Sequence, residues 1–385
     1  MVVQPLTVDL ETADLLEEAG GETFTLCYQC GVCTGSCPWN LVRKFDIRRL
    51  IHQVRLGLVD FEDEDVWTCV MCKLCVDRCP QGVVMPDIVR ALRRTVTELG
   101  IAKVPDSLRI TIKNVSAVGN PLGEPQEARA DWAKDLEIKT YTKGTEILYF
   151  PCCYQVYDPS AKRVALAAVN ILKKAGVDFG ILRDNVVCCG ESVRKAGNES
   201  IFQSLAQTNI NAFKEHNVSK IVVSSPHCYH TFKNEYPELG GDFEVIHYTQ
   251  YLAGLIKDGR MQFAKEVNKK VAYHDPCYLG RHNDIYDEPR EVLESIPGLQ
   301  LIELPNCREN SLCCGGGGGR IWAETKKGER FSDLRLQQAI EVGAQTLAAS
   351  CPYCILNFED SALTMDKADV IEIKDILELV LEALG

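Results

Sequence analysis

Two stretches of sequence decide how the first part of this chain folds: CYQCGVCTGSCP at residues 27–38 and CVMCKLCVDRCP at residues 69–80. Both have the form CxxCxxCxxxCP, and every cysteine of the first recurs 42 positions later in the second. Packing in a hydrophobic core does not require four cysteines to recur with the same spacing in two copies. Between the two copies, the spacing of Ile47, Leu50, Ile51 and Val54 predicts an amphipathic helix that joins two cysteine loops.

The three cysteines of a CxxCxxC loop supply three thiolates to one [4Fe–4S] cluster, and a fourth must come from elsewhere. In ferredoxins that carry two such clusters, the fourth cysteine of each run binds the other cluster. The spacing therefore predicts a helical variant of the two-cluster ferredoxin. We predict Cys27, Cys30, Cys33 and Cys79 as the ligands of one cluster, and Cys69, Cys72, Cys75 and Cys37 as the ligands of the other. Zinc is the alternative for paired CxxC motifs, but it leaves the third cysteine of each run and the trailing Cys-Pro unexplained.

The composition limits the class of protein. The chain has 385 residues, which predicts two or three domains, and a net charge of −12, which argues against nucleic acid as a partner. The N-terminal MVVQPLTVDLETADLLEEAG has neither a basic segment nor an apolar run, so we predict no secretory signal. No apolar run is long enough to cross a bilayer, and the final VIEIKDILELVLEALG has the pattern of an amphipathic surface helix. We therefore expect no direct membrane insertion and a cytoplasmic location, where 19 cysteines indicate metal or redox sites rather than disulfides.

A second and larger repeat fills the rest of the chain. Its first unit contains Cys153, then Cys188-Cys189-Gly190, then Ser225-Pro226-His227-Cys228. Its second unit contains Cys277, then Cys313-Cys314-Gly315, then Cys351-Pro352-Tyr353-Cys354. Corresponding positions lie 124 to 126 residues apart. The repeat predicts two similar domains that stand side by side.

Each unit alternates the patterns of buried strands and helices. We predict strands over residues 146–150, 220–224 and 271–273, and helices over residues 161–174, 201–215 and 333–347. Several cysteines directly follow strand-like runs, so they lie beyond the carboxyl ends of strands, where parallel sheets carry their sites. Residues 101–144 show little periodicity and contain several glycines and prolines, which predicts a linker over the surface.

Together these motifs resemble the CCG-domain (cysteine-rich) iron–sulfur family. The two CxxCxxCxxxCP motifs followed by two CCG units are similar to the fused form of the ferredoxin and catalytic subunits of heterodisulfide reductase, a form also used as the electron-transfer subunit of class II benzoyl-CoA reductase complexes. The resemblance implies an α+β multidomain chain. It has an N-terminal tail (1–22), an α-helical two-cluster ferredoxin domain (23–100), the linker (101–144) and two duplicated α/β CCG domains (145–262 and 263–385).

In this family a full CCG unit holds a noncubane [4Fe–4S] cluster through five cysteines, and a disulfide is reductively cleaved there. The resemblance therefore implies that the second unit binds such a cluster through Cys277, Cys313, Cys314, Cys351 and Cys354. The first unit has Ser225 at the position of the fifth ligand. Its four remaining cysteines, Cys153, Cys188, Cys189 and Cys228, favour an ordinary cubane over an empty site. Cys152 and Cys307 have no place in the pattern, and we interpret Cys152 as a packing residue.

Two further features concern the second unit. The run of five glycines predicts a backbone that approaches a cluster closely, with Gly315, Gly316 and Gly317 as cofactor-binding residues, and a flexible hinge is the alternative. Cleavage of a disulfide consumes protons, and His274 is our preferred proton donor among the four histidines near predicted ligands, which are His227, His230, His274 and His282. The alternative for all four is a hydrogen bond to backbone or to a thiolate.

The sequence contains no flavin, haem or nucleotide motif, so electrons have to arrive from a partner. The first hypothesis is an iron–sulfur electron-transfer subunit of a multi-subunit anaerobic oxidoreductase complex, with flavin-containing and other redox subunits as partners. The second is a heterodisulfide reductase-like enzyme that cleaves a disulfide itself, and the third is a zinc-stabilised scaffold without a redox role. The expected cofactors are two [4Fe–4S] clusters in the ferredoxin domain, one noncubane cluster in the second CCG domain and a further [4Fe–4S] cluster in the first.

Overall fold

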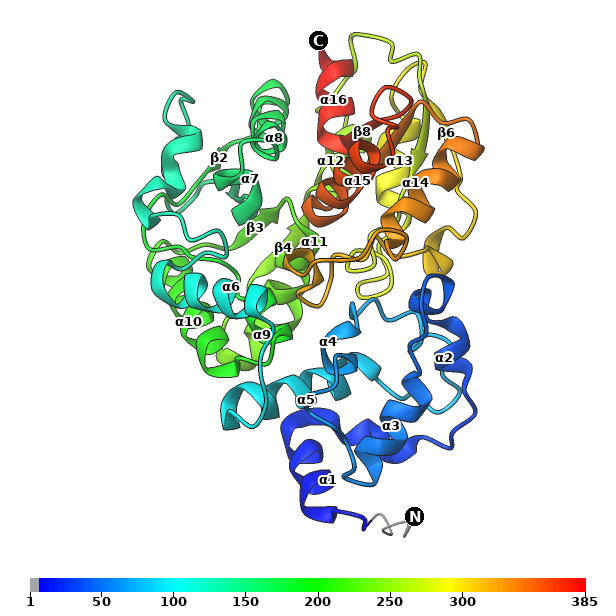
Figure 1. Cartoon of the computed structure of the whole chain (residues 1–385). Coiled ribbons are helices and arrows are strands. Elements are labelled where there is room, and N and C mark those ends of the chain that lie inside the picture. Colours follow the sequence, from blue (N-terminus) through cyan, green and yellow to red (C-terminus); the bar gives the residue numbers. More distant parts are fainter. Residues whose placement is uncertain (1–6) are drawn as a thin grey trace.

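The computed structural model describes residues 7–385, so residues 1–6 of the predicted tail lie outside the described part. A helical N-terminal part packs against two units that each contain a parallel sheet, as Figure 1 shows. This mixed architecture confirms the predicted fold class.

The helical part contains α1 (Leu10–Leu16), α2 (Val32–Ser36), α3 (Ile47–Arg55), α4 (Asp65–Thr68) and α5 (Met85–Leu99). Helix α3 is the helix predicted between the two cysteine loops, and its four apolar positions are all buried. Asp46 caps it, since its carboxylate accepts the backbone N–H of Arg49 at 3.1 Å. Helix α5 follows the second Cys-Pro and stops at Gly100, which has a φ of +64°. Helix α1 and the π-helical turn Glu17–Gly21 pack on α5.

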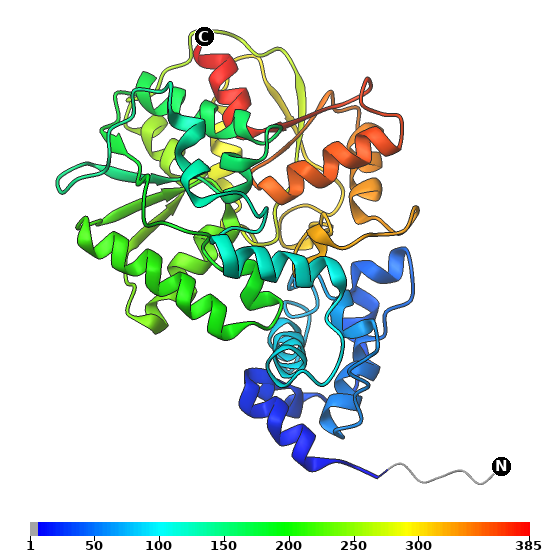
Figure 2. The ribbon, with the colours of Figure 1, turned by 60° about the vertical axis from the view of Figure 1, so that its left-hand side comes forward.

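The predicted linker, residues 101–144, contains regular structure. Helix α6 (Asp106–Val118) and a 3-10 helix (Gln126–Ala133) lie within it. Leu108 of α6 belongs to the hydrophobic core of the helical part, whereas Val115 belongs to a core of the sheet units. Helix α6 therefore runs along the boundary between these parts of the molecule (Figure 2).

The first sheet has the order β2-β1-β3-β4, and all its pairs are parallel. Its strands are β1 (Ile147–Phe150), β2 (Phe179–Gly180), β3 (Lys220–Val223) and β4 (Glu244–His247). The helices around it are α7 (Cys153–Tyr157), α8 (Lys162–Lys174), α9 (Glu191–Lys195), α10 (Glu199–Glu215), α11 (Pro226–His230) and α12 (Tyr248–Lys257). Strands β1 and β3 and helices α8 and α10 agree with the predicted elements within two residues at each end.

The second sheet repeats this topology with the order β6-β5-β7-β8. Its strands are β5 (Lys270–Tyr273), β6 (Gln300–Ile302), β7 (Thr346–Ala349) and β8 (Glu372–Asp375), and its helices are α13 (Asp287–Glu294), α14 (Phe331–Glu341), α15 (Pro352–Thr364) and α16 (Ile376–Leu384). Helix α16 packs on α8, and the equivalent pair α12 and α13 also pack together. Because each unit contributes the same two helices to the contact, the duplicated units are related by an approximate two-fold axis.

Two sequence-based boundaries are wrong. The helix predicted over residues 333–347 ends at Glu341, because Gly343 turns the chain with a φ of +76° and Thr346 begins strand β7. The C-terminal stretch predicted as one amphipathic helix begins with strand β8. Asp375 then caps α16 by accepting the N–H of Leu377 at 3.0 Å.

Candidate metal centres

The two cysteine loops of the helical part have the same local geometry. Gln29 and Met71, which are equivalent positions, have φ values of +67° and +54°. This conformation turns their N–H groups toward the first cysteine of each loop, and they donate to the sulfur of Cys27 at 3.4 Å and of Cys69 at 3.3 Å. Hydrogen bonds of this kind support thiolate ligands, since a donor near sulfur stabilises its negative charge.

Each predicted ligand set lines one cavity. The first cavity is lined by Cys27, Cys30, Cys33 and Cys79, and the second by Cys37, Cys69 and Cys72, while Cys75 borders both. The trailing cysteine of each run thus reaches the cavity of the other run, which is the exchange that the spacing predicts. Burial raises the pKa of Cys69 to about 11, so this thiol needs a metal or another cation before it ionises.

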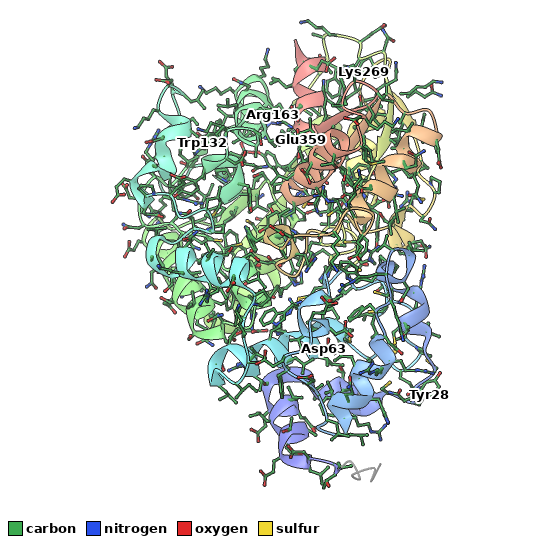
Figure 3. The ribbon with its side chains drawn as sticks, in the orientation of Figure 1. Tyr28, Asp63, Trp132, Arg163, Lys269 and Glu359 are labelled. Atoms are coloured by element: carbon green, nitrogen blue, oxygen red, sulfur yellow. The ribbon has the colours of Figure 1, made fainter. Side chains whose placement is uncertain are left out.

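The two cavities differ in exposure. Cys30 is the one exposed cysteine among the described residues, and Tyr28 beside it is 58% exposed at the edge of the helical part (Figure 3). Cys69 and Cys72 of the second cavity are buried against the sheet units.

The five cysteines predicted in the second CCG unit form a continuous series of thiol contacts. Cys277 contacts Cys313, which contacts Cys314, and Cys314 lies 3.3 Å from Cys354. Cys354 in turn contacts Cys351. All five are buried, and they come from the loop after β5, the glycine-rich loop and the start of α15. The structure therefore brings the whole predicted set together.

His274 lies against this set. A ring nitrogen of His274 and the thiols of Cys314 and Cys354 lie within 4.8 Å of one another, and Nε2 of His274 has no hydrogen-bond partner among the described residues. The buried Arg335 donates from Nε to Nδ1 of His274 at 3.3 Å, so the proton of a neutral ring sits on Nε2. Burial lowers the pKa of His274, which keeps the ring neutral at pH 7.

The first CCG unit gathers its cysteines in the same way. Cys153 begins α7, Cys188 and Cys189 precede α9, and Cys228 lies in α11; all four line one buried cavity. Cys152, interpreted from sequence as a packing residue, lines this cavity too.

The glycine-rich run packs on the second ferredoxin loop. A Cβ at Gly317 would lie 2.4 Å from the carbonyl oxygen of Val70, and one at Gly318 would lie 2.6 Å from that of Cys69. The N–H of Gly315 donates to the sulfur of Cys313 at 3.4 Å. The absence of side chains therefore allows the second CCG unit to approach the ferredoxin loop closely, and Cys313 contacts Cys72 across this boundary.

Two buried arginines hold the same boundary. Arg93 is fully buried and donates to the carbonyl oxygens of Val66 and Cys69 in the helical part, of Lys195 in the first CCG unit and of Gly318 in the second. Arg281 donates from Nε to the carbonyl oxygen of Cys72 at 2.6 Å, and its Nη2 has no hydrogen-bond partner among the described residues. Sequence reasoning missed both residues, since neither belongs to a cysteine motif.

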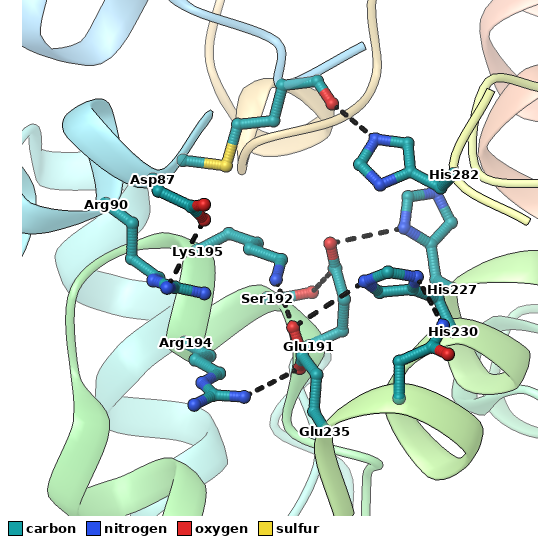
Figure 4. A network of polar contacts seen from close by, with 12 residues as sticks. Asp87, Arg90, Glu191, Ser192, Arg194, Lys195, His227, His230, Glu235 and His282 are labelled. Atoms are coloured by element: carbon teal, nitrogen blue, oxygen red, sulfur yellow. Dashed lines mark hydrogen bonds and ion pairs between the residues drawn. The ribbon is translucent and has the colours of Figure 1, made fainter. Parts of the chain in front are cut away.

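A polar network of the first CCG unit lies where this unit meets the helical part and the second unit, and Figure 4 shows it with Asp87 and Arg90 of the helical part and His282 of the second unit. His227 of the first unit lies 3.3 Å from Glu191, measured from Nδ1 to Oε1, and contacts Cys351 of the second unit. Burial disfavours the protonated form of the His227 ring, but the neighbouring Glu191 and Cys351 stabilise that form and raise the pKa of His227 to about 10. Glu235 is ion-paired with Lys195 and lies 3.8 Å from His230.

The remaining histidine near a ligand has a different contact. The Nε2 atom of His282 lies 2.9 Å from the carbonyl oxygen of Met71, within the second ferredoxin loop. Of the four histidines noted in the sequence, His274 and His227 lie against cysteines of the second unit, and His230 and His282 contact other groups.

Comparison with known proteins agrees with this geometry. Residues 23–83 match the family described as the 4Fe-4S dicluster domain, and residues 147–233 and 271–359 each match the cysteine-rich domain CCG. The chain is 32% identical over 389 residues to a subunit of the dihydromethanophenazine:CoB–CoM heterodisulfide reductase of Methanosarcina mazei, and the match covers 93% of both chains. The chain belongs to the CCG-domain iron–sulfur family that includes this heterodisulfide reductase subunit. The predicted family and the oxidoreductase class are thereby confirmed.

Longer members of this family are also similar. The chain is 36% identical to the probable iron-sulfur-binding oxidoreductase FadF of Bacillus subtilis, over 84% of this chain, and 35% identical to the EtfAB:quinone oxidoreductase of Syntrophomonas wolfei, over 83% of it. It spans about half of these two relatives, 47% of each. Within residues 7–385, no helix combines the length and the apolar character that crossing a membrane requires.

Proposed function

We propose that this chain is an iron–sulfur electron-transfer subunit of a multi-subunit, anaerobic, cytoplasmic oxidoreductase complex. It relays electrons between a flavin-containing partner, the two ferredoxin-type clusters and the CCG domains. Bound clusters of this kind accept and release single electrons, and the protein residues determine their order and spacing.

The donor chemistry of the cavities supports this proposal. Four thiols from two loops converge on each ferredoxin cavity, which suits a [4Fe–4S] cluster, and five thiols converge in the second CCG unit, which suits the family's noncubane cluster. The unpaired Nη2 of Arg281 lies in a buried position near Cys72, Cys277 and Cys313. A buried guanidinium needs an anionic partner, and thiolates bound to iron supply one.

The contact between Cys72 and Cys313 carries the relay hypothesis. Cys72 is a predicted ligand in the second ferredoxin cavity and Cys313 in the second CCG unit, and their thiols are in contact. The first cavity shares Cys75 with the second. A series of three adjacent sites therefore runs from the exposed Cys30 to the interior.

The exposed end of this series suits a redox partner. Leu26, Tyr28 and Val32 around Cys30 are 50%, 58% and 42% exposed, which is unusual for large apolar side chains in one short loop. Exposed Arg48 borders the same cavity. We propose that the flavin-containing partner docks here.

A second candidate function rests on a cavity beside Cys314. This cavity is lined by Cys314 together with Trp39, Gly315, Arg320 and Asn357 among other residues. A cavity beside a predicted ligand suits a disulfide substrate. His274 is a proton donor in this alternative only as an imidazolium, because the neutral ring has one N–H proton left, so substrate binding has to raise its lowered pKa. In this alternative the chain is a catalytic heterodisulfide reductase subunit.

Metal analysis and spectroscopy of anaerobically purified protein test the proposal. We expect iron and acid-labile sulfide in equal amounts and little zinc; about four zinc ions without sulfide would establish the scaffold hypothesis instead. Cys314→Ala should abolish the signal of the second CCG site and leave both ferredoxin clusters reducible, whereas Cys307→Ala, outside every predicted ligand set, should change neither. Loss of all signals in Cys314→Ala would contradict the assignment of separate sites.

Turnover separates the two candidate functions. A relay subunit should exchange electrons with a flavoprotein but should not cleave a heterodisulfide on its own with a strong chemical reductant. Rapid cleavage by the isolated wild-type chain, lost in His274→Ala, would favour the catalytic alternative. Identification of the proteins that copurify with the native chain would name the partners.

A further inference from the structure

The first CCG unit differs from the second at one position of its motif, where Ser225 replaces the cysteine equivalent to Cys351. In the second unit Cys351 lies at the end of the thiol series, in contact with Cys354. The same place in the first unit is beside Cys228, the equivalent of Cys354. The question is which side chain fills it.

Ser225 does not fill this place. Its hydroxyl caps α11, since it accepts the N–H of His227 at 3.3 Å, and Ser225 is not among the residues that line the cavity. A thiol fills it instead. Cys152 is buried, lines the cavity and contacts Cys228, which lines it too.

The thiols of the first unit consequently form a series of the same length as in the second. Cys153 contacts Cys188, Cys188 contacts Cys189, and Cys189 contacts Cys228. Cys152 completes it beyond Cys228. In the second unit the position equivalent to Cys152 is Pro276. Each unit therefore has one cysteine at this end of its series: Cys152, from the loop after β1, in the first unit, and Cys351, from the loop after β7, in the second.

The charge around this cavity points to an anion within it. Arg129 is 4% exposed and donates from Nη1 to the sulfur of Cys153 at 3.4 Å. Among residues 7–385 it has no carboxylate within ion-pair distance, unlike the buried Arg194 and Arg290. The buried Arg93 also has none, but its hydrogen bonds go to four carbonyl oxygens, whereas that of Arg129 goes to sulfur. An isolated buried cation is costly, whereas thiolates that bind iron would compensate it.

We propose that Cys152 is the fifth cysteine ligand of an iron–sulfur cluster in the first CCG unit, replacing the ligand that Ser225 removes, and that Arg129 is the counter-charge of this cluster. The inference rests on the proposed iron–sulfur function and extends it to a residue outside the family's motif. It also assigns the first unit a site with five thiols, like that of the second.

The test uses the full chain, purified without oxygen and loaded with iron and sulfide. Cys152→Ala and the nearly isosteric Cys152→Ser should each lose up to about four iron and four sulfide per chain, or shift the Mössbauer and EPR spectrum of one cluster. The signals removed by Cys314→Ala should persist, and Cys307→Ala, the matched control, should resemble wild type. Cys152→Ala combined with Ser225→Cys should restore the lost iron, because a thiol then returns from the position that Cys351 uses.

Arg129→Met gives an independent readout. The reduction potential of the same cluster should fall, because a positive charge that favours the reduced, more negative state is removed. We expect at least a tenfold decrease in the ratio of reduced to oxidised cluster at a fixed potential, which corresponds to a shift of about 59 mV for one electron.

Wild-type iron content and spectra in both Cys152 variants, with unchanged circular dichroism, would overturn the inference while leaving the proposed function intact. An Arg129→Met potential equal to wild type would overturn the counter-charge assignment. A wild-type chain without iron would overturn both the inference and the proposed function.

Discussion

Replacement of Gly317 by alanine should open the contact between the second CCG unit and the ferredoxin loop. The φ of Gly317 is not positive, so alanine suits its backbone and the effect is steric. The added Cβ would lie 2.4 Å from the carbonyl oxygen of Val70, whereas ordinary contacts begin at 3.4 Å. The two loops must therefore separate by about 1 Å.

Neither loop yields easily. The carbonyl oxygen of Cys69 accepts from Arg93 at 3.0 Å, and that of Thr68 accepts from Trp39 Nε1 at 2.8 Å, so the backbone on this side of Val70 is held from two directions. Overpacking of a site that cannot relax costs about 1–3 kcal/mol. If this cost falls on the docked state, local opening becomes about 5- to 150-fold more frequent.

Amide hydrogen exchange of the cluster-loaded chain measures this opening directly. The informative amides are those of Arg320 and Ile321, which donate to the carbonyl oxygens of Gly317 and Gly316 at 3.0 and 3.1 Å. Gly35→Ala is the matched control, since nothing lies within 4 Å of its added Cβ. Exchange in Gly317→Ala as slow as in wild type would refute the close approach of the two loops.

Two further predictions concern buried charges. Glu235→Gln leaves the buried ammonium of Lys195 without its ion-pair partner. In urea unfolding, this variant should destabilise the first CCG unit by about 3–5 kcal/mol. Glu238→Gln, at an exposed carboxylate, is the control and should change the free energy of unfolding by less than about 0.5 kcal/mol. Equal effects of the two variants would contradict this role of Glu235. Arg93→Met leaves four buried carbonyl oxygens without their hydrogen-bond donor, and each unpaired oxygen costs about 1–3 kcal/mol. Limited proteolysis should therefore cleave this variant between the helical part and the CCG units. A substitution at the more exposed neighbour, Arg94→Met, is the control and should leave the chain resistant. Resistance of Arg93→Met would show that other contacts hold the three parts together.

The sequence was sufficient for the features that depend on short spacing. The register of CxxCxxCxxxCP predicted which cysteines meet in each ferredoxin cavity, because a tight loop leaves few arrangements for its thiols. The apolar spacing from Ile47 to Val54 likewise predicted helix α3 with its buried face. The helix over residues 333–347 was predicted too long, because its apolar pattern continues into β7 and Gly343 was not recognised as its end.

The sequence did not predict the contacts between segments that lie far apart along the chain. Arg93 lies 24 residues from Cys69 and 225 residues from Gly318, and no periodicity relates a guanidinium to carbonyl oxygens so far along the chain. Helix α6 was predicted as linker because prolines and glycines surround it, although its two ends belong to different cores. Cys152 had one available signal, its position next to a motif cysteine, and that signal alone does not distinguish packing from ligation.

Both CCG units contact the ferredoxin part, but they differ in whether their cysteines contact ferredoxin cysteines, and this difference bears on the order of sites in the proposed relay. The second unit meets the ferredoxin loop through Cys313 and Cys72, whereas the thiol contacts of the first unit stay within that unit. The first unit instead meets the second through other side chains, since Ser192 hydrogen-bonds Tyr353 at 3.0 Å and His227 contacts Cys351. In the proposed relay, electrons that enter at the exposed Cys30 would reach the second unit before the first. The first unit is not needed to connect the second unit with the ferredoxin cavities, so this arrangement favours a terminal position for the first unit in the proposed relay.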